Sequence, residues 1–187
     1  MDATRDPELR RAALDLVAEI GYDRLTIDAV AARARAGKAT VYRRWAGKAE
    51  LVVDAFFEEM FGGLVTPDTG NLRDDLIDIA SQIWLGQGSI PRAQIMAGLM
   101  SALLSDPELR DLLVPGCAAP QSVFEAVVTR AADRGEIRRP ADLSVVGTVI
   151  PSMFMFRIVT TGQGPDAAFV AAVVDQVVIP ALNEEAE

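Results

Sequence analysis

Six basic side chains lie close together near the N-terminus, and no acidic residue occurs between Ala29 and Ala49. Such side chains bind phosphate oxygens, and an arginine can also donate two hydrogen bonds to O6 and N7 of a guanine. A basic stretch of this kind indicates a nucleic-acid-binding module, and the alternative interpretation is a solvated helix face. The six residues are Arg33, Arg35, Lys38, Arg43, Arg44 and Lys48.

The basic stretch belongs to an otherwise acidic chain of 187 residues with a formal net charge of −9. Residues 1–50 hold ten basic and eight acidic side chains, whereas residues 51–187 hold eight and nineteen. Half of all residues are hydrophobic and 24% are charged, which is typical of a globular protein with a sizeable core. The charge division indicates a DNA-binding module joined to a part with another role.

The spacing of apolar residues predicts a helix over residues 7–20, followed by two short helices over residues 27–34 and 38–45. Thr26 is the expected N-cap of the second helix. Two short helices across a tight turn, after a longer helix, form a helix-turn-helix. In that motif the helix after the turn lies in the major groove of DNA.

The third of these helices is expected to bury Val41 and Trp45, which lie four residues apart and so share one face. Because successive residues turn by about 100°, the opposite face carries Ala39 and Arg43. Arginine there can bind guanine, and the small alanine lets the backbone approach the base edges. The flanks carry Thr40, Tyr42 and Arg44, and Lys48 begins the next helix, where backbone N–H groups favour a phosphate.

The segment from Leu25 to Leu51, LTIDAVAARARAGKATVYRRWAGKAEL, resembles the DNA-binding signature of the TetR family of bacterial transcriptional regulators. Its Thr-Val-Tyr run and the later Lys-x-x-Leu are the most specific parts. The resemblance implies phosphate contacts from Thr26, Lys38, Thr40, Tyr42 and Lys48, and places Ala39, Arg43 and Arg44 at the groove or its rim. Arg35 stands where the family commonly has glycine, and Gly37 where it commonly has serine or threonine. Arg35 must therefore avoid or tolerate a positive φ.

Beyond residue 50 the helical period continues without strand alternation, so the predicted fold class is all-α with about nine helices. We expect residues 1–47 to form the DNA-binding domain and residues 48–187 a helical ligand-binding and dimerisation domain. Asn71 and a capping box at Ser105 are the expected helix starts, with an interruption at Pro115 and Gly116. The helices expected after residue 47 cover 48–62, 72–85, 91–104, 105–135, 142–160 and 166–182.

The last two expected helices are apolar on nearly every side, as in LSVVGTVIPSMFMF and AAFVAAVVDQVVIPAL. Such helices must be covered on all sides, and a second subunit is the simplest cover. The resemblance also implies a homodimer that pairs through two C-terminal helices and binds a near-palindromic operator. The expected interface residues are Val146, Ile150, Phe169, Val173 and Val177.

Flexible or flat apolar side chains in the C-terminal part suggest a pocket for a small hydrophobic or aromatic effector, although plain core packing explains each of them singly. Arg157 could anchor a ligand carboxylate or form a structural ion pair. The candidates are Trp84, Met96, Met100, Phe124, Met153, Phe154 and Arg157. The predicted function is a repressor that such a ligand releases from DNA, and the alternative is a helical binding or scaffold module without specific DNA recognition.

Other classes of function are not expected. The sequence has no histidine and one cysteine, so the usual zinc sites and catalytic triads lack a member. We therefore expect no enzyme activity, metal or cofactor. The cysteine, Cys117, is expected in a loop. The longest charge-free stretch, residues 143–156, is shorter than the about 20 residues of a membrane-spanning helix, so no membrane partner is expected. The start shows no signal-peptide pattern, which predicts a cytoplasmic protein.

Overall fold

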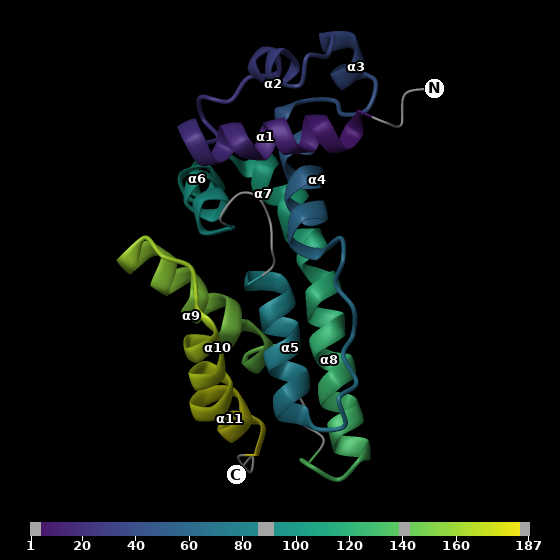
Figure 1. Ribbon diagram of the computed structural model, residues 1–187, viewed down its shortest axis with the longest axis vertical. Helices are drawn as coiled ribbons and strands as arrows, with labels where there is room; N and C mark the ends of the chain where they lie inside the picture. Colours follow the sequence, from purple (N-terminus) through teal and green to yellow (C-terminus); the bar gives the residue numbers. More distant parts are fainter. Residues whose placement is uncertain (1–4, 86–91, 139–142, 184–187) are drawn as a thin grey trace. The chain divides into compact units, whose positions relative to one another are not determined.

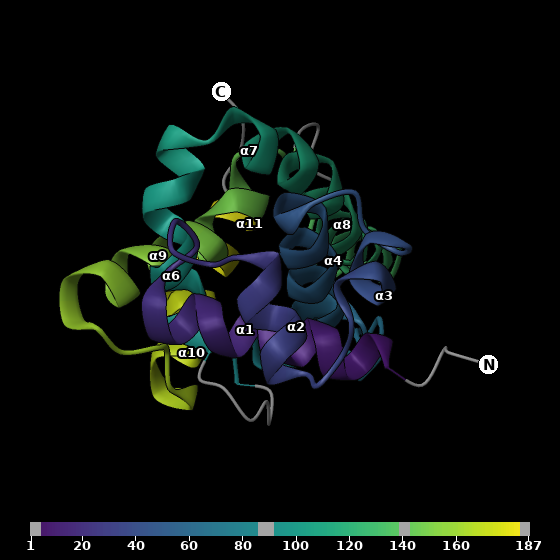
Figure 2. The ribbon, with the colours of Figure 1, turned by 90° about the horizontal axis from the view of Figure 1, so that it is seen from above.

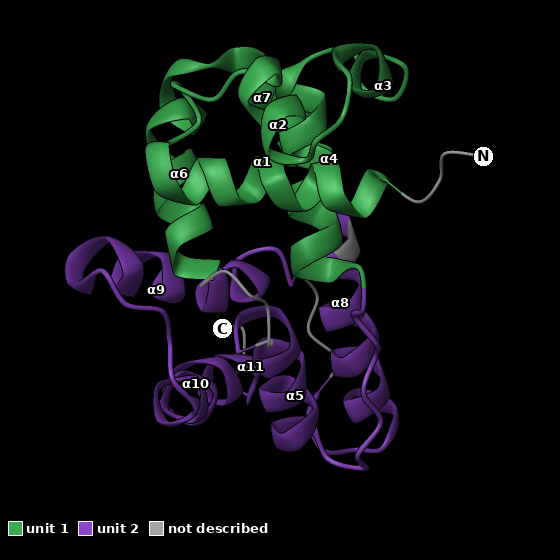
Figure 3. Cartoon of the chain, turned by 45° about the horizontal axis from the view of Figure 1, so that its top comes forward, with its two compact units in different colours: residues 1–62, 88–117 green, residues 63–87, 118–187 purple. Residues whose placement is uncertain are grey.

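The computed structural model describes residues 5–85, 92–138 and 143–183. These residues form helices and connecting turns, and no strand occurs among them (Figure 1). The all-α prediction is therefore confirmed. The described residues divide into two compact units: residues 1–62 with 88–117, and residues 63–87 with 118–187 (Figure 3). The predicted division into domains at residue 47 stays a prediction.

The first unit is built around a long N-terminal helix. This helix contacts α2, α4 and α6, and Figure 2 shows it running across the unit with α4 beside it. The core includes Leu9, Val17, Val41 and Leu51, none of which is exposed to solvent. The helices are α1 (Asp6–Ile20), α2 (Ile27–Arg33), α3 (Lys38–Tyr42), α4 (Lys48–Phe61), α6 (Arg92–Ser105) and α7 (Pro107–Leu113), with a 3-10 turn at Val114–Cys117.

Helices α1 and α6 approach each other closely because Gly98 has no side chain. A Cβ atom at Gly98 would lie 2.2 Å from the backbone oxygen of Val17. The backbone N–H of Tyr22 donates to the Gly98 oxygen at 3.1 Å, directly after α1 ends. The Tyr22 side chain is buried and its hydroxyl bonds to Asp106, and this burial is the main reason why the pKa of Tyr22 is raised.

The start of α7 corrects the prediction of a capping box at Ser105. The N-cap is Asp106, whose side chain accepts the N–H of Leu109 at 3.2 Å. Ser105 instead ends α6, and its hydroxyl donates to the Ser101 oxygen. The reason is Pro107, which disfavours a helical conformation in the residue before it and so makes Asp106 the extended cap.

The chain is helical without a break from Pro107 to Asp133, so the predicted interruption at Pro115 and Gly116 is only the 3-10 turn. Cys117 ends that turn, and its expected place in a loop is wrong. By length and composition alone this helix could cross a membrane, with a mean hydropathy of 1.3, a test that core helices of soluble proteins also pass. Within the described residues no other helix has this length and hydropathy, and the absence of a membrane partner stays a prediction.

The second unit packs α5 against α8 and α10, and α9 against the π-helical stretch. Asn71 caps α5 as predicted, accepting the N–H of Asp74 at 2.8 Å, and Asp166 caps α10. The core includes Leu76 and Phe154, which are almost fully buried. The helices are α5 (Leu72–Trp84), α8 (Ala118–Asp133), α9 (Val146–Thr161), α10 (Ala167–Val173) and α11 (Ile179–Asn183), with the π-helical stretch at Val174–Val178 between the last two.

Charged groups hold the start of α5 in this unit. Asp75 is fully buried and accepts hydrogen bonds from the N–H and the hydroxyl of Thr69 at 2.7 and 2.8 Å. Glu136 accepts the N–H of Leu72 at 2.7 Å, and this bond is the main reason why the pKa of Glu136 is lowered. Arg73 forms an ion pair with Asp175 of the π-helical stretch at 2.7 Å. These contacts fix α5 against its neighbours.

Candidate nucleic-acid interface

Helix α2 begins as predicted. The Thr26 side chain accepts the N–H of Ala29 at 3.2 Å, and the buried face holds Ile27 and Val30. The helix ends with two backbone bonds: the N–H of Arg35 donates to the Ala32 oxygen at 3.2 Å, and the N–H of Ala36 to the Ala31 oxygen at 2.8 Å. This pair of bonds is a Schellman motif, whose left-handed residue is usually glycine.

Arg35 occupies the left-handed position of this turn with a φ of 51°, so it tolerates the conformation for which glycine is common. The same motif at the end of α8 uses Gly135, with a φ of 78°. Arg35→Gly is expected to raise the free energy of unfolding by roughly 1 kcal/mol, because it removes the Cβ strain. The matched change Gly135→Ala is expected to lower it by a similar amount. Chemical denaturation checks both, and a less stable Arg35→Gly protein would contradict the strain.

Helix α3 turns its apolar side inward and its polar side to solvent. Val41 is fully buried and Trp45 is 5% exposed, while Tyr42 is 56% exposed. The regular helix ends at Tyr42 rather than at Trp45, because the next residues tighten: the N–H of Arg44 donates to the Val41 oxygen at 2.9 Å. The predicted phase nevertheless holds, and the outward side carries Lys38, Ala39, Tyr42, Arg43 and Arg44, with Thr40 half-buried.

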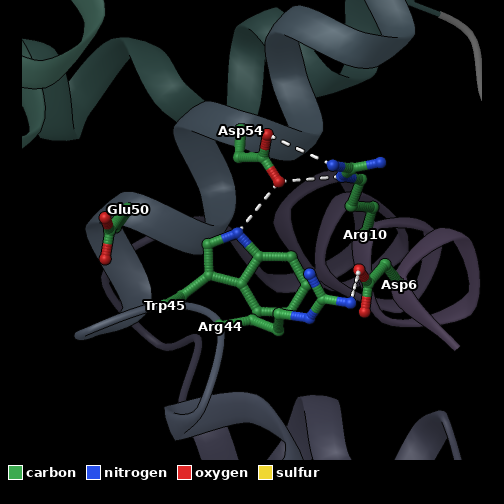
Figure 4. A pocket seen from close by; sticks show the side chains of 6 residues that line it. All are labelled: Asp6, Arg10, Arg44, Trp45, Glu50 and Asp54. Carbon is green, nitrogen blue, oxygen red and sulfur yellow. Dashed lines mark hydrogen bonds and ion pairs between the residues drawn. The ribbon is translucent and has the colours of Figure 1, made fainter. Parts of the chain in front are cut away.

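The turn that follows α3 is fixed to two other helices through one carboxylate (Figure 4). Oδ2 of Asp54 on α4 accepts Nε1–H of Trp45 at 2.9 Å and Nε–H of Arg10 on α1 at 2.8 Å. The same contact with Asp54 is the main reason why the pKa of Arg10 is raised. Glu50 accepts the N–H of Ala46, which holds the turn before α4. The outward face of α3 is thus supported by the part-buried contacts of Asp54 with Trp45 and Arg10.

The basic side chains have partners that the sequence did not predict. Acidic residues outside the basic stretch pair with three of them: Arg33 with Glu19 at 2.6 Å, Lys38 with Asp28 at 2.7 Å, and Arg44 with Asp6 at 3.1 Å. Lys48 lies over the ring of Tyr22, with its Nζ 4.3 Å from the ring centroid and 3.4 Å from the Tyr22 backbone oxygen. No sequence spacing shared by these pairs could have revealed them, because the two partners of each pair come from different segments of the fold.

The predicted pocket residues do not all come together. Met96 and Met100 belong to α6 in the first unit, whereas the other candidates belong to the second. Phe154 is fully buried, with its ring centroid 5.3 Å from that of Trp84, and Phe124 is 6% exposed in the same core. Phe154 and Phe124 thus belong to the core of the second unit, and the half-buried Trp84 packs against Phe154.

An open, largely apolar groove of about 650 Å³ lies along α9 and includes two of the predicted pocket residues. Arg157 at its edge pairs with Asp166 at 3.0 Å, donates to the Gly164 oxygen and lies 4.6 Å from the centroid of the Phe169 ring. This contact corresponds to the structural ion pair that the sequence left open for Arg157. The groove is lined by Ser152, Met153, Phe156, Arg157, Thr160, Thr161 and Phe169.

The expected dimer residues differ in exposure within the single chain. Val173 is only 2% exposed and belongs to the core of the second unit, while Val146, Ile150, Phe169 and Val177 are half-buried. Large apolar side chains outside this predicted set are far more exposed on and beside α9. They are Val145 at 73%, Phe156 at 70% and Val159 at 63%.

Helix α3 has an outward polar side and follows α2 across a tight turn, and α2 packs on the longer α1. This arrangement defines a helix-turn-helix DNA-binding protein. The sequence matches the family model for bacterial regulatory proteins of the tetR family over residues 9–55. It also matches the model for the tetracyclin repressor-like C-terminal domain over residues 66–177. The chain therefore belongs to the TetR family and is a helix-turn-helix transcriptional regulator.

Related proteins agree with this assignment. The chain is 40% identical, over 96% of its length and 88% of the relative, to an HTH-type transcriptional regulator of Mycobacterium tuberculosis. It is 36% identical, over 94% and 93% of the two chains, to the DNA-binding transcriptional repressor TetR of Mycobacteroides abscessus. Its fold matches that of the transcriptional regulator FadR from Bacillus subtilis in complex with stearoyl-CoA, with a TM-score of 0.67, 17% identity and coverage of 96% and 98%.

Proposed function

We propose that this regulator is a repressor: a homodimer that binds a near-palindromic operator and leaves it when a small hydrophobic or aromatic molecule binds. The observation that carries the DNA-binding part is the outward side of α3. Ala39, Tyr42 and Arg43 are exposed there, opposite the buried Val41 and Trp45. A slim, basic face of this kind suits the major groove. A scaffold role without DNA recognition is not favoured, because relatives over nearly the whole chain are named as transcriptional regulators.

In the proposed complex Arg43 contacts base edges and Ala39 allows close approach. Phosphates would be bound by the residues that flank this face or begin the neighbouring helices. Thr26 and Lys48 support this arrangement by their positions at the starts of α2 and α4, where backbone N–H groups attract anions. The proposed phosphate-binding residues are Thr26, Lys38, Thr40, Tyr42 and Lys48, with Arg44 at the rim of the groove.

The proposed dimer rests on the exposed apolar side chains of α9. Phe156 and Val159 lie three residues apart on this helix and are both mostly exposed, which a single chain leaves without cover. A partner chain seated on this face would cover them, and the half-buried Val146, Ile150, Phe169 and Val177 would border the contact. Two-fold symmetry would then place two copies of α3 on successive major grooves.

The proposed effector site is the groove along α9. Phe156 belongs both to this groove and to the exposed apolar face. A partner chain on that face would therefore cover a groove that is open in the single chain. Its lining is apolar apart from Arg157 and hydroxyl groups, which suits a hydrophobic or aromatic molecule. The complex of FadR with stearoyl-CoA supports a ligand of this character in a protein of the same fold. As a regulator of bacterial transcription the protein would work in the cytoplasm.

A binding-shift assay with duplexes rich in candidate palindromes, run at two salt concentrations, tests the DNA-binding proposal. We expect retarded complexes whose affinity falls at least about tenfold between about 50 and 200 mM salt, because phosphate contacts release counterions from DNA. Retention of the same weak affinity on every duplex at both salt concentrations would contradict specific DNA recognition.

A further inference from the structure

Two cations of the proposed DNA-binding face are already engaged in ion pairs in the DNA-free chain. Lys38 Nζ lies 2.7 Å from Oδ2 of Asp28 on α2. Arg44 Nη2 lies 3.1 Å from Oδ2 of Asp6, the first residue of α1 (Figure 4). Both acids lie outside the basic stretch of the sequence, and the fold brings each one to a cation that would otherwise meet a phosphate. The face therefore carries its own anionic partners.

A carboxylate and a phosphate compete for the same N–H donors, because both are anions that accept charge-assisted hydrogen bonds. The Lys38 pair is open to solvent, with 60% and 63% of the two side chains exposed, while Asp6 is only 16% exposed beside an Arg44 that is 43% exposed. The exposed Lys38 pair is weak and screened by salt, whereas the pair of Arg44 with the largely buried Asp6 is screened less. A phosphate at hydrogen-bond distance can therefore replace the carboxylate, whereas one a few ångströms farther away cannot.

We infer that Asp6 and Asp28 are specificity-determining residues of the DNA-binding face. When DNA docks loosely, Arg44 and Lys38 stay paired with these two carboxylates. When α3 is fully seated on an operator, the DNA phosphates replace the carboxylates as partners of the two cations. The two carboxylates thus lower the affinity for unrelated DNA more than the affinity for the operator. This inference rests on the proposed function, because it assigns the control of selectivity to the same face.

The test compares Asp6→Asn and Asp28→Asn with the unmodified protein on two probes: a mixed-sequence duplex and a duplex carrying the palindrome that the protein selects. Fluorescence anisotropy at several salt concentrations gives the affinities. On the mixed-sequence duplex each change is expected to raise the affinity about threefold and to steepen the salt dependence by about one counterion. On the selected duplex the rise is expected to be smaller, so the ratio of the two affinities falls.

Glu19→Gln is the matched control. It removes the same single negative charge from the first unit and breaks an ion pair about as close as that of Lys38 with Asp28, at 2.6 and 2.7 Å to Arg33. Arg33 is on α2 and is not among the proposed DNA contacts, so the ratio of affinities is expected to stay unchanged. The melting temperature of each variant shows whether it is folded. Because Asp6 and Asp28 belong to different helices, each variant tests the inference without relying on the stability of the other's helix.

Three results would overturn the inference. Unchanged ratios in both asparagine variants would show that the carboxylates do not withhold the cations. An equal change in Glu19→Gln would show that net charge alone acts, and weaker binding to both probes would show that the acids position the cations instead. In all three cases the unmodified protein still binds DNA, so the proposed function stands. Failure of the unmodified protein to bind either probe would instead overturn the proposed function, and the inference with it.

Discussion

Phe156→Arg is expected to convert the regulator from a dimer to a monomer and to weaken operator binding by at least about 100-fold, because two linked DNA-binding domains bind far more tightly than one. Phe156 is 70% exposed on α9, beside Val159 at 63%. Burying an aromatic side chain stabilises an interface by about 1.5–3 kcal/mol, whereas a buried and unpaired guanidinium destabilises it. Sedimentation at micromolar concentration and titration of the operator measure the two effects.

Ala126→Arg is the control for this prediction. Ala126 is exposed on α8, so the change adds the same charge to the same unit away from the proposed interface. We expect this variant to remain a dimer with unchanged operator affinity. A change at Val173 would be less informative, because that side chain is buried within its own unit and a charge there would disturb the core. A Phe156→Arg protein that sediments as the unmodified dimer would contradict the proposed interface.

Arg43→Ala is expected to cost roughly 1–3 kcal/mol of operator binding, or about 5- to 150-fold in affinity, and to relax the preference for one base position. The loss follows from the place of Arg43 on the outward side of α3, opposite Val41 and Trp45. Tyr42→Phe is expected to weaken all sequences alike, because the Tyr42 hydroxyl is assigned to a phosphate. Titration of the operator and of its single-base variants distinguishes the two patterns.

Arg24→Ala separates the role of Arg43 from that of charge. Arg24 is exposed in the same unit, but it lies in the turn before α2 and its Nε–H donates to the Ile20 oxygen. Its loss removes one positive charge without touching α3, so base preference is expected to remain. If Arg43→Ala keeps both the affinity and the preference of the unmodified protein, the assigned face of α3 is wrong.

Local sequence signals predicted most of the helices because their causes are local. The caps at Thr26 and Asn71 need only a side chain that reaches the next turn, and both are confirmed. The buried pair Val41 and Trp45 follows from helical spacing in the same way. The start of α7 was misplaced by one residue because the pattern at Ser105 resembles a capping box, while the proline at position 107 governs the backbone.

The remaining features depend on tertiary placement. The ion pairs of Lys38 with Asp28 and of Arg44 with Asp6 join different segments of the fold, so no spacing in the sequence predicts them. The outward face of α9 could not be predicted from the sequence either, because a helix that is apolar on all sides has no polar side to indicate its orientation. The sequence could therefore identify α9 as a helix to be covered but could not identify Phe156 as its most exposed aromatic residue.

The central claim is that two α3 faces recognise a specific near-palindromic operator. Repeated selection of duplexes from a random library by the purified protein, followed by sequencing, tests this claim most directly. We expect enrichment of a near-palindrome whose half-site centres are separated by about 10 base pairs or somewhat more, and loss of that enrichment in Arg43→Ala. A folded, dimeric protein that enriches no common sequence would contradict the account.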